Sequence, residues 1–320
     1  MMIRNIKTNI YKILTGYGFY ICIIFTAVLC FSAYIYEDSM NGDKYSVFMA
    51  YKTFDKSCIA KHKIFVKGFI RHKYSVFMAY KTFDKDFMLS DTRFCSFEVM
   101  LKGAGSWLSL FIPLISAFAF IPLVCDEYEA KSVRFEIFRS SKLCYNLSKF
   151  ITACLCGGFA VMLGFGLFTL ADYALFPNIN EYSTELKKTY EEFLVYSYPD
   201  ITQNGYGFII LKKLGEMFLY GAVCAAPAIM FTGFIRNKYL VLCIPFFIKY
   251  AVSQTCIKLQ SQAVSDYNNV DTEMLKISSI FNPDALSYLS DFGNDKKLVL
   301  IYNGALLFSA AIIYLITQSR

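Results

Sequence analysis

Histidine is almost absent from this sequence, and the common catalytic motifs are missing. The two histidines, His62 and His72, do not form an HExxH motif, and neither lies in an apolar stretch where it could assist an intramembrane serine. No GxxxxGK[ST] phosphate-binding loop occurs, so the chain cannot hydrolyse ATP by that route. We therefore expect no enzymatic activity, no cofactor and no metal site in this chain.

Charged residues are also scarce. They make up 18% of the 320 residues, whereas hydrophobic residues make up 56%. A soluble globular chain has about a quarter of its residues charged. The excess of apolar side chains predicts a protein that is embedded in lipid.

Six stretches are long and apolar enough to cross a membrane as helices, which takes roughly 20 residues. Four of them contain no charged residue, and the other two carry Glu216 near one end and Lys249 near the middle. A central lysine costs roughly 3 kcal/mol on insertion, so the span with Lys249 is expected to insert as a hairpin with the span before it. We expect an all-α integral membrane protein, one transmembrane domain over 1–320, with spans at 17–36, 105–125, 150–171, 214–235, 239–257 and 298–317.

The N-terminal segment is basic and amphipathic. Isoleucines recur at helical spacing through residues 3–13 with lysine and arginine between them, a pattern typical of a helix in the lipid headgroup layer. The apolar run that follows has 20 uncharged residues, more than the roughly 7–15 of a signal peptide, so it is interpreted as an anchor. We expect an amphipathic elbow helix before the first span.

The distribution of lysine and arginine predicts the orientation. The termini and the segments 126–149 and 236–238 are richer in these residues than the loops 177–213 and 258–297. Since short cytoplasmic segments carry the positive excess, both termini are expected in the cytoplasm and the chain in the cell membrane. The net charge of +7 then reflects topology and attraction to anionic lipid, and no basic, aromatic-interleaved patch predicts nucleic-acid binding.

The loop 37–104 contains an internal repeat. Residues 44–56 and 73–85 both read KYSVFMAYKTFDK. A single pair does not make a solenoid, so the repeat is either a duplicated recognition strand or a duplication that a surface loop tolerates. Cys58 and Cys95 lie in the same loop, and their spacing leaves a disulfide between them open.

The segment 126–149 between the second and third spans is the most informative polar region. Acidic residues come first and basic residues later, the order that a helix dipole favours. Val133 and Ile137 share one face, and Phe135 and Phe138 lie on a neighbouring one. The segment is either a solvated loop or an amphipathic cytoplasmic helix that rests on lipid or docks into a partner.

Two groups of residues follow a known pattern. They are Glu127, Tyr128, Glu129, Ser132, Val133, Arg134, Arg139, Ser140, Ser141 and Lys149 after the second span, and Asn237, Lys238, Tyr239, Pro245 and Phe246 at the start of the fifth. Together with the elbow helix, they resemble the membrane-spanning permease subunits of ATP-binding-cassette (ABC) transporters of the type-two exporter class, of the divergent Gram-positive bacterial type. Ala130 and Lys131 stand in the region where that family usually has a glycine.

The resemblance implies partners and contact residues. It implies a cytoplasmic ATP-binding subunit, a second permease in a homo- or heterodimer, and a coupling helix between spans two and three. On that basis Glu127, Glu129, Arg134 and Arg139 are expected to contact the ATPase. Two alternatives stay open: a carrier that works without ATP, and a membrane scaffold or immunity protein without transport activity.

Charged residues inside spans are functional candidates. Lys249 is expected either to pair with Glu216 across the hairpin of spans four and five, to line a substrate path, or to extend its ammonium group toward the membrane surface.

Overall fold

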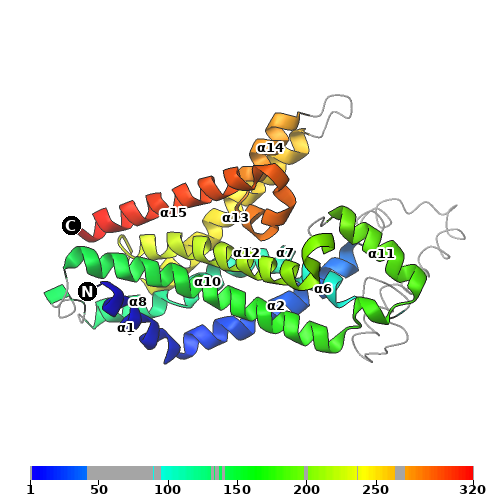
Figure 1. The fold of residues 1–320 in the computed structure, drawn as a ribbon. Coiled ribbons are helices and arrows are strands. Elements are labelled where there is room, and N and C mark those ends of the chain that lie inside the picture. The colour runs from blue at the N-terminus through cyan, green and yellow to red at the C-terminus, as the bar shows by residue number, and fades with distance from the viewer. Residues whose placement is uncertain are drawn as a thin grey trace, which may run out of the picture. The chain divides into compact units, whose positions relative to one another are not determined.

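The structure is a computed structural model that describes residues 2–41, 89, 95–130, 133, 137–138, 141–197, 201–235, 237–263 and 271–319. All regular elements in these residues are helical (Figure 1). The repeat at 44–56 and 73–85 and Cys58 lie outside the described residues. The chain divides into two compact units: unit 1 comprises 1–27, 109–166 and 200–320, and unit 2 comprises 28–108 and 167–199.

Five helical stretches are long and apolar enough to cross a membrane. They are Leu108–Glu129, Lys142–Glu181, Gly205–Phe231, Lys238–Ala263 and Lys296–Gln318. Helix α1 (Met2–Leu14) and the first part of α2 (Tyr17–Asn41) meet at a bend of 66° and pass the same test together, which gives up to six spans. The described residues thus confirm an all-helical protein with five or six helices that are long and apolar enough to span a membrane.

The second span is interrupted, a feature that its uninterrupted apolar sequence does not predict. Two residues, Ala119 and Phe120, separate helix α7 (Ser106–Phe118) from α8 (Ile121–Glu129). Phe120 has a φ of −135° and caps α8, and Pro122 follows in the first turn. Because proline has no N–H, it cannot continue the hydrogen-bond ladder of α7, and it is well tolerated at a helix start.

Helices α10 (Lys142–Leu175) and α12 (Ile201–Phe231) pack closely within unit 1, where glycines allow their backbones to approach. A Cβ atom on Gly157 would lie 2.8 Å from the Cβ of Ala225, and one on Gly221 would lie 2.7 Å from the Gly157 carbonyl oxygen. A Cβ on Gly158 would lie 2.8 Å from Phe218. Small residues at a helix crossing are typical of membrane helix pairs. Gly157 and Gly158 therefore lie where the two helices pack closely.

Replacing Gly221 with valine should destabilise the protein by about 1–3 kcal/mol, because the new side chain would overlap the Gly157 backbone. The matched control is Gly215→Val on the same helix, where a Cβ meets nothing within 4 Å. The measurement is the free energy of unfolding in mixed micelles by detergent titration. Equal stability of the two variants would contradict the close helix crossing.

Residues 258–297, expected to form a loop, contain two further helices. After α13 (Lys238–Ala263) come α14 (Thr272–Phe281) and the 3-10 helix η4 (Pro283–Asp295), which leads into α15 (Lys296–Ser319). The Asp271 carboxylate caps α14 by accepting from the Met274 N–H at 3.0 Å. α14 packs on α13, and η4 packs on both α12 and α15. Within this segment, Ala285, Leu286 and Ser287 of η4 are buried and belong to the core of unit 1, whereas most of α14 is exposed or half-buried.

Unit 2 contains α6 (Ser96–Gly103), η3 (Ile179–Glu181) and α11 (Thr184–Ser197). The Tyr190 hydroxyl on α11 donates to the Glu98 carboxylate at 3.1 Å, and the Ser96 N–H donates to the Pro177 carbonyl at 3.1 Å. The two latter elements occupy part of the expected loop 177–213. Cys95 is a buried free thiol, and its burial raises the pKa of that thiol.

Candidate functional site

A lysine lies near the middle of α13 and is almost entirely buried. The Lys249 side chain is 8% exposed, and its Nζ lies 2.7 Å from an Asp284 carboxylate oxygen. Asp284 is in the first turn of η4, and its side chain is 19% exposed. An isolated charge at this burial would be costly, so each group serves as the counter-charge of the other.

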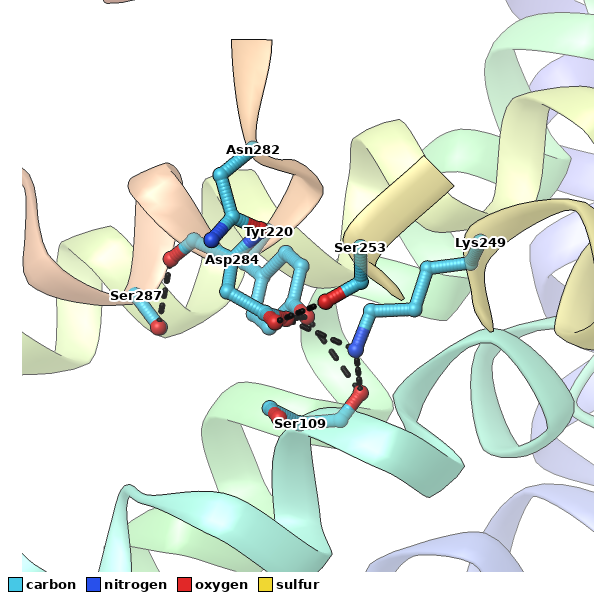
Figure 2. A network of polar contacts seen from close by, with 7 residues as sticks. All are labelled: Ser109, Tyr220, Lys249, Ser253, Asn282, Asp284 and Ser287. Carbon is cyan, nitrogen blue, oxygen red and sulfur yellow. Dashed lines mark hydrogen bonds and ion pairs between the residues drawn. The ribbon is translucent and has the colours of Figure 1, made fainter. Parts of the chain in front are cut away.

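A proline in a third helix creates the second acceptor for Lys249. Pro113 lies inside α7 and has no N–H, so the carbonyl of Ser109, four residues earlier, loses its usual helical donor. That carbonyl instead accepts a hydrogen bond from Lys249 Nζ, and the Tyr220 hydroxyl of α12 lies 3.3 Å from it (Figure 2). The proline within α7 thus leaves a fixed partial negative charge, on the Ser109 carbonyl, beside the ammonium group.

The Asp284 carboxylate has donors from three directions. Besides Lys249, it accepts from the Tyr220 hydroxyl and, at 3.2 Å, from the Ser253 hydroxyl (Figure 2). Ser253 follows Lys249 by four residues on α13, so both point to the same face of that helix. We call Ser109, Tyr220, Lys249, Ser253 and Asp284 the lysine–aspartate network.

The local sequence around Asp284 fixes its position. The Asn282 side chain caps η4 and accepts from the Asp284 N–H at 3.1 Å, while Pro283 supplies a preset φ in the first turn. The Ser287 hydroxyl donates to the Asp284 carbonyl at 2.7 Å. Because Lys249 precedes the end of α13 by 14 residues, or about 21 Å of helix, the chain must return well along α13 to bring Asp284 to it.

A second buried lysine continues the polar region along α12. Lys213 Nζ donates to the Ser287 carbonyl and lies 3.6 Å from the Glu216 carboxylate, one helical turn away. The side chains of Lys213 and Glu216 are 7% and 3% exposed. The ring of Tyr288 lies 4.9 Å from the Lys213 ammonium. Ser287 therefore bridges this pair to the lysine–aspartate network.

An apolar cavity of about 380 Å³ lies beside the network in unit 1. Its wall is formed mainly by α12, α13 and α15, with Pro113 from α7 and with Phe281 and Pro283. Lys249 is the charged residue of this wall, and Asn303 is a polar one. The volume lies within the range of small-molecule sites, about 300–1,000 Å³.

A second charged cluster joins the N-terminal helix to the ends of two spans. The Glu127 carboxylate at the end of α8 accepts from Lys12 of α1 at 2.8 Å and from Lys149 of α10. Lys149 is 1% exposed, and the rings of Phe120 and Tyr145 lie 6.0 and 5.4 Å from its ammonium group. We call Lys12, Glu127 and Lys149 the elbow cluster.

The structure places the predicted site residues in different surroundings, and some of them lie outside the described residues. Lys249 pairs with Asp284, and Glu216 lies beside Lys213, so the two do not pair with each other as one prediction proposed. Glu129 is exposed at the end of α8, whereas Glu127 is held in the elbow cluster. Arg134 and Arg139 lie outside the described residues. Of the segment around them, Val133, Ile137 and Phe138 are helical, and Phe138 is 91% exposed.

Sequence reasoning missed Asp284, Lys213 and the Ser109 carbonyl. Two signals were present. Pro113 inside an apolar run marks a carbonyl without a helical donor, and Asn282 followed by Pro283 marks the start of a helix in a presumed loop. Within the described residues, no three His, Cys, Asp or Glu side chains gather as metal ligands would.

No family model, curated protein or solved structure matches this chain. Its function is therefore inferred from the architecture and the site.

Proposed function

We propose that this chain is the membrane-spanning permease subunit of an ABC exporter, and that the cavity and the lysine–aspartate network form part of its translocation path. The observation that carries the proposal is a buried ion pair beside an apolar cavity, about halfway along a membrane-length helix. A bundle that served only as an anchor would be as stable with apolar residues there. Charged residues at such positions usually serve ion or substrate pathways.

The elbow cluster supports the coupling part of the proposal. Glu127 and Lys149, two residues that carry the resemblance to ABC permeases, contact each other. With Lys12 they tie α1 to the ends of α8 and α10. A partner that moved the segment 126–149 would therefore act on two spans and the N-terminal helix together. In this proposal Glu129, Arg134 and Arg139 contact the ATPase, and Glu127 fixes the segment that bears them.

The proposed assembly has a cytoplasmic ATP-binding subunit and a second permease, in the cell membrane with both termini cytoplasmic. Apolar surface is available for lipid and for the second permease. Of the 18 residues that form the most apolar part of α15, 22% are buried. The corresponding share in the span Leu108–Glu129 is 61%. ATP hydrolysis takes place on the partner subunit.

Reversing the charges of Arg134 and Arg139 together should reduce the amount of ATPase retained on the purified chain by about tenfold or more, because like charges at an interface repel. Lys188→Glu with Lys258→Glu is the matched control, since it reverses two exposed charges expected on the opposite side of the membrane. The measurement is the ratio of ATPase to permease after affinity purification. An unchanged ratio with normal membrane insertion would contradict the contact assignment.

A carrier driven by an ion gradient is the second candidate, and one observation favours it. Glu216 and Asp284 are acidic groups joined through Lys213, Ser287 and Lys249 into one polar track. Proton-coupled carriers use buried acids of this kind. Transport that persists without ATP and stops when the proton gradient is dissipated would support the carrier instead of the exporter.

A further inference from the structure

The wall of the cavity is chemically asymmetric. Lys249 belongs to the wall, but its counter-ion Asp284 and the hydroxyl donors Tyr220 and Ser253 do not. The rest of the wall is dominated by aliphatic, aromatic and proline side chains. A molecule inside the cavity therefore meets apolar surface almost everywhere and a cationic residue at one position.

The ammonium group of Lys249 has capacity for a further acceptor. A lysine has three N–H donors. Among the described residues, the acceptors in contact with Lys249 are one Asp284 oxygen and the Ser109 carbonyl, and the centre of the Tyr220 ring lies 5.9 Å from the ammonium group (Figure 2). An anionic ligand group could thus join these two without displacing either, and the fixed Ser109 carbonyl would keep the ammonium group in place.

The cavity is bounded by side chains that also face outward from the chain. Ile248 of α13 is 44% exposed, and Leu306 and Ile313 of α15 are 43% and 40% exposed. These residues line the cavity and belong to helices that qualify as membrane spans. A ligand could therefore enter between α13 and α15 from the hydrocarbon layer, which favours a lipophilic compound over a hydrated ion.

The volume limits the size of the ligand. About 380 Å³ is near the lower end of the range for small-molecule sites. That space suits one acyl chain with its head group better than a two-chain phospholipid.

We propose that the cavity binds a single-chain lipophilic anion, such as a long-chain carboxylate, with its head group at Lys249 and its chain between α13 and α15. This inference names a substrate class for the translocation path and rests on the proposed function in that respect. The anionic head group forms a charge-assisted hydrogen bond with Lys249. The acyl chain of the ligand contacts the apolar wall of the cavity instead of membrane lipid.

The test is equilibrium binding of radiolabelled oleate to the purified full chain in phosphatidylcholine nanodiscs, without ATP or an ATPase. Oleate should bind saturably and be displaced by unlabelled oleate. Methyl oleate should compete at least about tenfold less well, because it has the same chain but no charge for Lys249 to bind. Equal competition by the ester would overturn the assignment of an anion, and absence of saturable binding would overturn the site.

Two variants and one matched control locate the binding. Ala310 lines the cavity and is 7% exposed, so Ala310→Phe should fill it and weaken oleate binding by about tenfold or more. Ala305→Phe, on the exposed side of the same helix and outside the cavity wall, is the matched control and should bind as the wild type does. The double variant Lys249→Met with Asp284→Leu removes both charges together, so neither is left buried without its counter-charge, and it should lose the preference for oleate over the ester. Unchanged binding by Ala310→Phe, or a retained preference in the double variant, would overturn the proposal.

These outcomes are separable from those of the exporter proposal. If oleate fails to bind but an ATPase accompanies the chain, the substrate class is wrong and the exporter assignment stands. If oleate binds and no ATPase is found, the binding site stands and the carrier becomes the better description.

Discussion

Replacing Asp284 with alanine should lower the free energy of unfolding by about 3 kcal/mol, because Lys249 would be left buried without a counter-charge. The cost exceeds that of an ordinary hydrogen bond, about 1 kcal/mol, since the Tyr220 and Ser253 hydroxyls would lose an acceptor as well. Breaking a buried ion pair costs about 3–5 kcal/mol, and the lower value applies here because the Asp284 side chain is 19% exposed. The measurement is the free energy of unfolding in mixed micelles, obtained by titrating a denaturing detergent and monitoring helix content by circular dichroism.

The controls for this prediction separate charge from position. Asp295→Ala removes an acid at the other end of η4, where its partner Lys276 is 51% exposed, and should cost less than about 1 kcal/mol. The double variant Lys249→Met with Asp284→Leu should regain most of the stability lost by the single variant, because no buried charge then lacks a partner. A double variant that is less stable than Asp284→Ala would contradict the pairing.

Replacing Glu127 with glutamine should have a comparable effect, about 3 kcal/mol or more, because Lys149 is almost fully buried against it. Glutamine keeps the shape of the side chain but removes the charge that Lys149 and Lys12 share. Because the elbow cluster joins three helices, we also expect faster proteolysis near the N-terminus. The first readout is the free energy of unfolding, and the second is the rate of cleavage by a protease added to the purified protein.

Glu129→Gln is the matched control for Glu127→Gln. It makes the same chemical change two residues away, on an exposed side chain, and should alter stability by less than about 0.5 kcal/mol. Lys12→Met should fall between the two, since Lys12 is 34% exposed and its loss leaves Glu127 with Lys149. Equal effects of Glu127→Gln and Glu129→Gln would show that the elbow cluster does not stabilise the fold.

The membrane-length helices could be predicted from the sequence because hydropathy is a property of the segment itself. The stretches 150–171 and 298–317 are uncharged, and each lies within a single long helix of the structure. The packing role of Gly157 and Gly158 was predictable for a similar reason, since small residues in an apolar helix have few other uses.

The helical content of the presumed loops was harder to predict. α12 begins at Ile201, well before the predicted start at 214, and residues 258–297 contain α14 and η4. These segments carry charged residues, so a hydropathy window rejects them, and their helices depend on caps and on packing against α12, α13 and α15. Gly205 adds a kink, with a φ of 73° that a glycine adopts without strain.

The partner of Lys249 could not have been identified from the sequence. A central lysine requires a counter-charge or a cavity, but the sequence offers many acids and fixes no distance between them. Glu216 was the candidate because it lies in the neighbouring span, whereas Asp284 reaches Lys249 only because η4 folds back along α13. The choice between the two acids is a consequence of tertiary packing.

The most direct test of the proposed function is co-purification of the tagged chain from native membranes in mild detergent, with mass spectrometry of what accompanies it. The exporter proposal predicts an ATPase subunit with a Walker-type phosphate-binding loop, in near-equal amount to the chain. Recovery of the chain alone, under conditions that keep known transporters intact, would contradict the proposal and favour a carrier or a membrane scaffold.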